Sequence, residues 1–458
     1  MERPTSAWAD TASSRLPATG PRVRGLDGIR GLAALFVVLN HVFLRAFPGY
    51  PVDHAPFWAA PFIYGRFAVV VFIVLSGFSL AIAPARSGWR LDGVVAFAKR
   101  RAWRILPPYW AALTFSLAMT WFVVAQPGWP IPDVRSVWVN GLLVQDVFLV
   151  PSPNRTFWSI AIEAQLYLVF ALLILLMRRL NAIAMLAAVA TPVLCLGFLS
   201  LGHDRRATNL IVQYTPDLAV LFAIGVAAAG IVRAAPRWRR LPWHWFACVF
   251  AVPVLVLIGA RGSTWTIDNL YWIDLALGPA IGCLLAAVAT SRPRAIVRAL
   301  DTRPLRRLGS FSYSLYLTHA PIVIAVYYGV LRGAVPQGVP MFLVLAAIVL
   351  PLTVGFARLF AECFELPFQR RRGWAVVRDA WGRAVSHAAA LQPGRVALAT
   401  ARGHRALRVD GTLLAHLRRQ PAGVAGLLDA PLDRIGRVAQ VEHHHREQRS
   451  EGREQPEP

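Results

Sequence analysis

Cysteine is scarce in this sequence, and its few copies stand far apart. The four cysteines are Cys195, Cys248, Cys283 and Cys363, and each lies in a separate apolar stretch. A zinc site or a redox motif needs cysteines, often with histidines, at close and regular spacing. The sequence therefore argues against both, and we expect the protein to work without a bound metal ion.

Acidic residues and lysine are scarce as well. Asp and Glu number 24 against 48 Lys and Arg, which gives a net charge of +24, and Lys99 is the one lysine. In a soluble protein so large a positive charge would suggest nucleic acid as a partner. Here the arginines cluster between long apolar runs, where they determine membrane topology. We therefore expect no nucleic-acid partner.

Apolar residues, in contrast, are abundant. They make up 56% of the chain, with 16 Trp and a mean hydropathy of +0.48, which is well above the usual level in a soluble domain. Runs long enough to cross about 30 Å of hydrocarbon predict an all-α polytopic membrane protein with about ten transmembrane helices. The ten predicted spans are 26–46, 66–84, 107–125, 156–177, 181–200, 213–232, 243–260, 270–290, 309–331 and 340–361.

Arginine clusters occur in alternate connections between these spans, at 86–104, 178–179, 233–240, 292–307 and 370–372. Because positive charge stays on the cytoplasmic side, both termini are predicted to be cytoplasmic. No cleavable signal peptide is visible in residues 1–25, a polar segment, so we expect the first span to act as an uncleaved anchor.

Two further segments differ from the spans. Residues 136–150 are apolar but short, with polar interruptions such as Asn140 and Asp146, so we expect this segment to be interfacial or re-entrant. Residues 369–458 are rich in Arg, Gly, Pro and Ala and predict a cytoplasmic, partly disordered basic tail. The run of three histidines at 443–445 lies in this tail, and we assign it no chemistry.

The first span contains two ionisable side chains, Arg30 and His41, with ten uncharged residues between them. Eleven steps of about 100° leave the two side chains roughly 20° apart around the helix and about 16 Å apart along it. A cation and an imidazole on one stripe of a membrane helix indicate a polar path. On spacing alone, an interfacial anchor and a hydrogen-bonded packing residue remain the alternative.

Two other spans place ionisable groups in the central to outer part of the bilayer, namely Glu163 in the fourth span and His319 in the ninth. Together with His41 they would be costly in lipid unless they surround one water-filled chamber. We therefore expect a single chamber that joins Arg30 to His41. Interhelical hydrogen bonds are the alternative for each residue taken alone.

The order of several motifs resembles the acyltransferase-3 family of integral membrane acyltransferases. The spacing of Arg30 and His41 is similar to the arginine, ten residues, histidine signature of that family. The motifs are LDGIRGLAALFVVLNH with Arg30 and His41, VVVFIVLSGFSL with Ser76, KRRAWRILPPYW with Arg101 and Arg104, TFWSIAIEAQLYL with Trp158 and Glu163, and LGSFSYSLYLTHAPI with Tyr313, Tyr316 and His319. They cover residues 26–372, and the expected acyltransferase domain is 26–368. The sequence departs from the family pattern at Ala164, where a second carboxylate is usual.

The resemblance implies a multi-pass enzyme of the bacterial inner membrane that transfers an acyl group, commonly acetyl. The donor would be cytoplasmic acyl-CoA, and the acceptor a hydroxyl of a cell-surface glycan, a lipid-linked sugar or a related molecule. It implies catalytic roles for His41, as the general base, and for Arg30 and Glu163. Arg30, Arg101 and Arg104 would bind the phosphates of coenzyme A. The expected chamber residues are His319, Tyr313, Tyr316, Ser76 and Trp158.

A proton-coupled transporter or exporter is the alternative, because intramembrane Arg, His and Glu also build proton relays. No repeated halves are visible in the sequence, which favours the enzyme. Neither the acceptor nor the length of the acyl chain can be chosen from these residues, and the oligomeric state also stays open.

Overall fold

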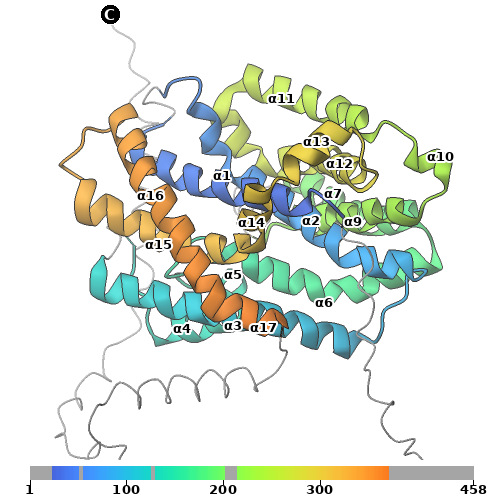
Figure 1. Ribbon diagram of the computed structural model, residues 1–458, viewed down its shortest axis with the longest axis horizontal. Helices are drawn as coiled ribbons and strands as arrows, with labels where there is room; N and C mark the ends of the chain where they lie inside the picture. The colour runs from blue at the N-terminus through green and yellow to red at the C-terminus, as the bar shows by residue number, and fades with distance from the viewer. Residues whose placement is uncertain (1–22, 51–54, 125–128, 202–213, 371–458) are drawn as a thin grey trace, which may run out of the picture. The chain divides into compact units, whose positions relative to one another are not determined.

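The α1 helix, Leu26–Ala46, is a central element of the fold, because it contacts α2, α14, α15 and α16. In the computed structural model (Figure 1), residues 23–50, 55–124, 129–201 and 214–370 are described, and all of them belong to one compact unit, Met1–Ala384. The left-handed Gly25, at φ 89°, precedes α1. Asp27 in the first turn and Arg45 in the last turn both complement the helix dipole.

Helices are the only regular elements in the described ranges. They are α1, α2 (Gly65–Arg86), α3 (Val94–Ala118), α4 (Val134–Gly141), α5 (Gln145–Phe148), α6 (Phe157–Arg179), α7 (Ala182–Leu201), α9 (Asp217–Ala228), α10 (Pro236–Arg239), α11 (Trp243–Asp268), α12 (Leu270–Ala289), α13 (Arg294–Leu300), α14 (Arg303–Ser310), α15 (Ser312–Val326), α16 (Val339–Phe360) and α17 (Leu366–Arg370). Short 3₁₀ turns lie at Ala60–Tyr64 and Ala229–Arg233, and π-helical turns at Met119–Val123, Tyr327–Leu331 and Ala361–Glu365.

The prediction of an all-α polytopic membrane protein is confirmed. Eight helices of the described residues are long and apolar enough to cross a membrane, namely Leu26–Ala46, Ala60–Arg86, Phe157–Arg179, Ala182–Ser200, Trp243–Asp268, Leu270–Ala289, Ser312–Leu331 and Val339–Gln369. The other two predicted spans coincide with α3 and α9. The first of these begins early, at Val94, so Arg100, Arg101 and Arg104 lie on the helix itself. The second has only 12 residues.

The segment 136–150 is too short to span, as predicted, and forms α4 and α5. Asp133 caps α4 by accepting a hydrogen bond of 2.7 Å from the backbone N–H of Ser136. The buried Asn140 donates to the carbonyl oxygens of Ser136 and Pro151 and accepts a hydrogen bond from the Tyr109 hydroxyl at its own carbonyl. These bonds satisfy carbonyl oxygens of α4 and, at Pro151, of the non-helical segment that follows α5.

Close backbone contact joins α2 to α9. A side chain at Gly77 would collide with the carbonyl oxygen of Phe222, and one at Gly225 would collide with that of Val74. Glycine is therefore required at both positions of this crossing, in the way that small residues allow membrane helices to approach closely.

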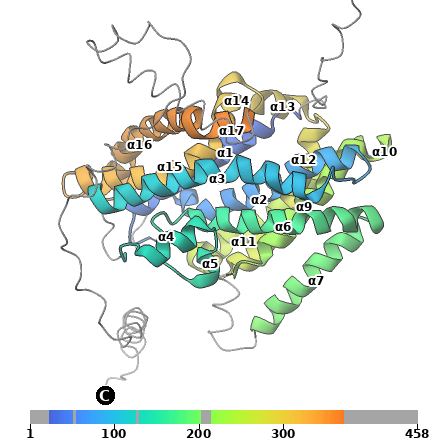
Figure 2. The ribbon, with the colours of Figure 1, turned by 90° about the horizontal axis from the view of Figure 1, so that it is seen from below.

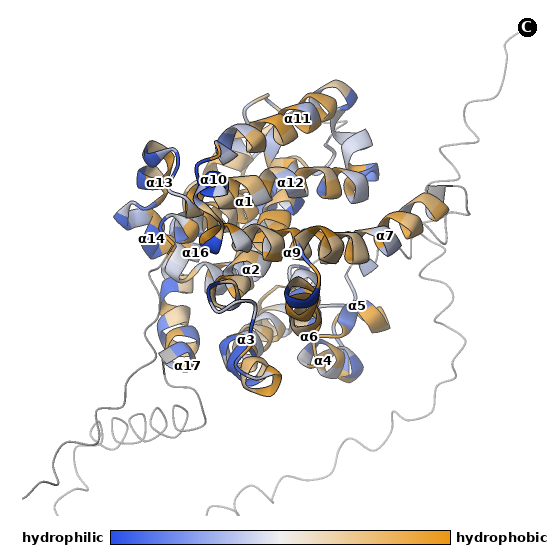
Figure 3. Ribbon diagram, turned by 90° about the vertical axis from the view of Figure 1, so that its right-hand side faces the viewer, coloured by the Kyte–Doolittle hydropathy of each residue, from blue (hydrophilic) through white to orange (hydrophobic). Residues whose placement is uncertain are grey.

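Hydrophobic residues dominate the helices that have few neighbours. Figure 2 shows α7 extending from the edge of the helical unit, and only 17% of the most apolar 18-residue stretch of this helix is buried. Hydrophilic residues instead gather on α13 and α14 (Figure 3). The expected N-terminal segment lies outside the described residues up to position 22, and so does the expected tail from position 371. The boundaries predicted for them therefore stay predictions.

Candidate active site

A cavity of about 440 Å³ lies among α1, α2, α3, α6, α14, α15 and the start of α17. It brings together most of the residues that the sequence suggested. The lining includes Arg30, Ser76, Arg101, Arg104, Glu163, Tyr313 and Tyr316. These side chains come from five separate helices, α1, α2, α3, α6 and α15, and meet in one volume, which we call the first cavity.

Arg30 is held in place from two sides. Its Nη1 donates to Asp27 Oδ1 at 3.0 Å, one turn earlier on α1, and its Nη2 donates to Ser79 Oγ of α2 at 2.6 Å. The Nε of Arg101, in contrast, is buried without a hydrogen-bond partner among the described residues. An unsatisfied buried donor is costly, so a ligand atom that accepts its hydrogen bond would be favoured there.

Glu163 forms a small network in the same cavity. Its Oε1 accepts hydrogen bonds from Ser76 Oγ at 2.6 Å and from Tyr167 OH at 2.5 Å. Tyr167 lies one turn further along α6, while Ser76 comes from α2. No hydrogen bond joins Glu163 to His41 in the part of the chain that the structure describes, so Glu163 does not orient the imidazole directly.

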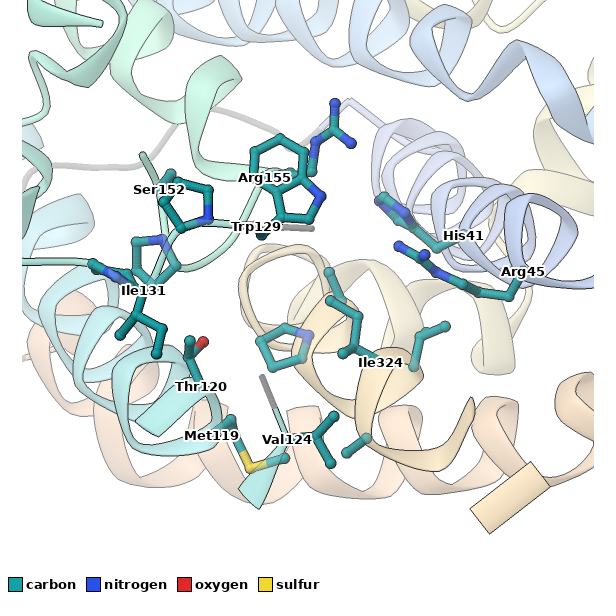
Figure 4. A pocket seen from close by; sticks show the side chains of 17 residues that line it. His41, Arg45, Met119, Thr120, Val124, Trp129, Ile131, Ser152, Arg155 and Ile324 are labelled. Atoms are coloured by element: carbon teal, nitrogen blue, oxygen red, sulfur yellow. The ribbon is translucent and has the colours of Figure 1, made fainter. Parts of the chain in front are cut away.

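His41 lines a different cavity, of about 50 Å³ (Figure 4), which we call the second cavity. It shares this cavity with Arg45, Thr120, Trp129 and Arg155. The single chamber that we expected from Arg30 to His41 is thus divided into two cavities. Helical periodicity places Arg30 and His41 on one stripe of α1. Side chains of neighbouring helices, however, fill the space between these two residues.

Three aromatic rings lie in a row between the two cavities. Tyr316 lines the first cavity and its ring centre is 5.9 Å from that of His319, which in turn is 4.9 Å from that of His41. Tyr316 OH shares a 2.6 Å hydrogen bond with Ser159 Oγ, and the edge of Phe72 meets its ring at 5.7 Å. These contacts close the end of the first cavity.

His319 is fully buried, and its two nitrogens differ. Nδ1 lies 3.0 Å from the carbonyl oxygen of Leu315. Because a carbonyl oxygen can only accept, Nδ1 carries the proton and donates. Nε2 therefore bears a lone pair, and it is buried without a partner among the described residues. His319 thus forms no hydrogen bond to His41 through Nε2, and the two imidazoles meet by ring contact.

Comparison with known proteins identifies the family of this chain. The sequence model of a family described as an acyltransferase domain matches residues 23–360. The chain belongs to the acyltransferase-3 family. It is 28% identical to acyltransferase MdmB of Streptomyces mycarofaciens, over 67% of this chain and 81% of that protein. It is 24% identical to O-acetyltransferase OatA of Staphylococcus aureus, over 76% of this chain and 57% of that protein. No solved structure matches the chain significantly.

Membership of the acyltransferase-3 family makes the chain a membrane acyltransferase, and the names of its relatives favour this function over a transporter. Within the described residues, no group of three His, Cys, Asp or Glu side chains is placed to hold a metal ion.

The sequence analysis of this acyltransferase missed one buried ionic cluster. Arg66 Nε donates to Asp274 Oδ2 at 2.5 Å and its Nη2 donates to Asp217 Oδ2 at 3.1 Å, and both carboxylates are almost fully buried. The guanidinium also lies 5.3 Å from the ring centre of Trp158, which packs here and is absent from the described lining of the first cavity. Acidic residues inside two predicted spans were the available signal.

Proposed function

We propose that this acyltransferase transfers an acetyl group from acetyl-CoA to a hydroxyl of a cell-surface glycan or lipid-linked sugar. The observation that carries the proposal is the row of rings that leads from the arginine-lined first cavity to His41. A donor that enters the first cavity would meet, beyond Tyr316, the imidazole that can accept a proton from the acceptor.

The donor would bind through its phosphates. Arg30, Arg101 and Arg104 line the first cavity from α1 and α3, and guanidinium groups bind phosphate oxygens through paired, charge-assisted hydrogen bonds. The unsatisfied Nε of Arg101 supports this role. A volume of about 440 Å³ suits the pantetheine arm of coenzyme A, since ligand pockets commonly hold 300–1,000 Å³.

The orientation of the protein in the membrane would follow from the distribution of arginine between its two sides. With the basic ends on the cytoplasmic side, as in a bacterial inner membrane, the first cavity would face the cytosol and the second cavity the opposite side. The donor and the acceptor would then approach His41 from opposite directions. Tyr316 would have to turn aside and release Ser159 for the thioester to reach the imidazole.

The reaction itself needs one proton shuttle. His41 takes the proton of the acceptor hydroxyl while the oxygen of that hydroxyl attacks the thioester carbonyl carbon. The bond between that carbon and sulfur then breaks, and the departing thiolate receives the proton from the imidazolium. The products are an acetate ester and coenzyme A with a free thiol. Glu163, with its hydroxyl partners in the first cavity, would contact the donor.

The test is acetyl transfer by the purified protein in nanodiscs. The assay supplies radiolabelled acetyl-CoA and an extract of envelope glycans and lipids from the cells in which the protein occurs. We expect labelled product from the wild-type protein and a loss of at least about 100-fold in His41→Ala, because general-base catalysis contributes about 10²–10⁴-fold. His244→Ala, on α11, is the matched control and should keep its activity. Equal rates of His41→Ala and wild type would refute the proposal, as would product formed without acetyl-CoA.

A further inference from the structure

The charge of the second cavity is one-sided. Among the described residues that line it, His41, Arg45 and Arg155 are the titratable side chains, and none is acidic. The lining of the first cavity, in contrast, contains carboxylates such as Asp27 and Glu163. A cationic group that has no acidic partner is costly within a membrane protein, and Arg45 has none among the described residues, so the second cavity favours a ligand that brings negative charge.

Arg45 is well placed to recognise such a ligand. It lies one helical turn beyond His41, on the same face of α1, so the two side chains start about 6 Å apart. Its Nη1 donates to the hydroxyl of Tyr328 at 3.2 Å, and its guanidinium lies 5.6 Å from that ring centre. This partner is neutral, and Arg45 forms no ion pair with the described carboxylates. Its charge therefore stays available.

The opposite side of the cavity carries a second cation. Figure 4 shows His41 and Arg45 extending from α1, with Trp129 and Arg155 across the cavity from them. The guanidinium of Arg155 lies 4.2 Å from the ring centre of Trp129, which orients it by a cation–π contact. Two arginines from distant parts of the chain thus flank the imidazole.

We infer that the acceptor alcohol carries a carboxylate or phosphate group close to the hydroxyl that is acetylated, and that Arg45 binds this group. The inference rests on the proposed function, because it assumes that His41 activates the hydroxyl. Because Arg45 and His41 start one helical turn apart on the same face of α1, the anion would lie near the reacting oxygen, on the same sugar unit or the next one. The volume of about 50 Å³ accommodates a group the size of a few water molecules, which suits either anion.

A different role for Arg45 gives a different result. If its charge stabilised the tetrahedral oxyanion of the reaction, its loss would slow transfer to every acceptor equally. If it binds an anionic group of the acceptor, its loss slows transfer to anionic acceptors and leaves neutral ones unaffected. Selectivity for charge, rather than the rate alone, is therefore the quantity to measure.

The experiment divides the envelope extract by anion exchange into a neutral and an anionic fraction before the assay with radiolabelled acetyl-CoA. The protein is held in phosphatidylcholine nanodiscs, so that the nanodisc adds no anionic lipid. We expect labelled product in the anionic fraction, and about 10- to 100-fold less of it with Arg45→Gln, the size of one lost charge-assisted contact. Arg45→Lys should restore part of the rate. Partition of the product between chloroform and water distinguishes a lipid headgroup from a soluble glycan.

Arg332→Gln is the matched control, because the exposed Arg332 also lies close to Tyr328, 5.2 Å from its ring centre, and does not line the second cavity. It should leave the rate unchanged. Product found in the neutral fraction would overturn the inference but not the proposed function, and so would an equal loss of transfer to both fractions with Arg45→Gln. Absence of product from both fractions with the wild-type protein would instead refute the proposed function.

Discussion

The imidazole rings of His41 and His319 lie 4.9 Å apart, centre to centre, where α1 contacts α15. The Nδ1 of His319 donates to Leu315, and the Nε2 is buried without a partner in the described part of the chain. Together with Tyr316, which lines the cavity that holds Arg30, this pair separates the two cavities. We propose that His319 positions the imidazole beside it by ring contact.

Replacing His319 by Asn tests that role. The Asn amide can still donate to the Leu315 carbonyl, but it has no atom at the place of Nε2. We expect kcat to fall about 10-fold or more while the KM for acetyl-CoA stays the same, because the lost ring packs against His41 and does not line the first cavity. His319→Gln, which offers an amide near that place, should recover part of kcat. An unchanged kcat in steady-state assays of His319→Asn would contradict the prediction.

Arg101 should affect the donor alone. Since its Nε is buried without a partner among the described residues and its side chain lines the first cavity, Arg101→Gln is expected to raise the KM for acetyl-CoA about 10-fold, with little change in kcat. The control is Arg90→Gln, at an exposed arginine that does not line the cavity. If both variants shifted KM equally, a general effect of positive charge would explain the result instead.

Arg66 is expected to matter for stability. Its replacement by Met leaves Asp217 and Asp274 buried without their cation, and breaking a buried pair in this way costs about 3–5 kcal/mol. The thermal transition of the purified protein, followed by tryptophan fluorescence, should shift to lower temperature. A triple variant that also carries Asp217→Asn and Asp274→Asn removes the unpaired charges and should regain part of the loss. A single variant that melts like the wild type would disprove the role.

Asp133 gives a prediction that depends on pH. Hydrogen bonds from Ser136 lower the pKa of Asp133 below its usual value. The folded state favours the ionised form of Asp133 more than the unfolded state does. The cap therefore stabilises α4 fully above the unfolded-state pKa of about 3.9, and this stabilisation is lost as the pH falls through the lowered pKa of the folded state. Asp133→Ala at neutral pH should cost α4 about 1 kcal/mol.

Hydrogen exchange of the amides in Val134–Gly141 measures this cost. Exchange should be faster in Asp133→Ala than in the wild type. The control is Asp92→Ala, because Asp92 is exposed and caps no helix, and this variant should leave the exchange unchanged. Identical protection in Asp133→Ala and wild type would mean that the cap contributes nothing.

Local physics made much of the fold predictable. Apolar runs of membrane length predicted the helices, and polar interruptions such as Asn140 predicted that 136–150 would not span. The predicted span 107–125 covers only the later part of α3, because a hydropathy criterion excludes the basic turns that contain Arg101 although they are helical. Basic residues have good helix propensity, and their charge can lie beside the membrane.

The sequence by itself determined which residues could form the site: spacing along α1 related Arg30 to His41, and the same reasoning selected Glu163 and His319. Only the tertiary structure decided that Arg30 and His41 line separate cavities and that His319 lies beside His41. The physical reason is that helical periodicity sets the direction of a side chain from its own axis. What fills the space beyond depends on how other helices pack, and residues distant in sequence decide that.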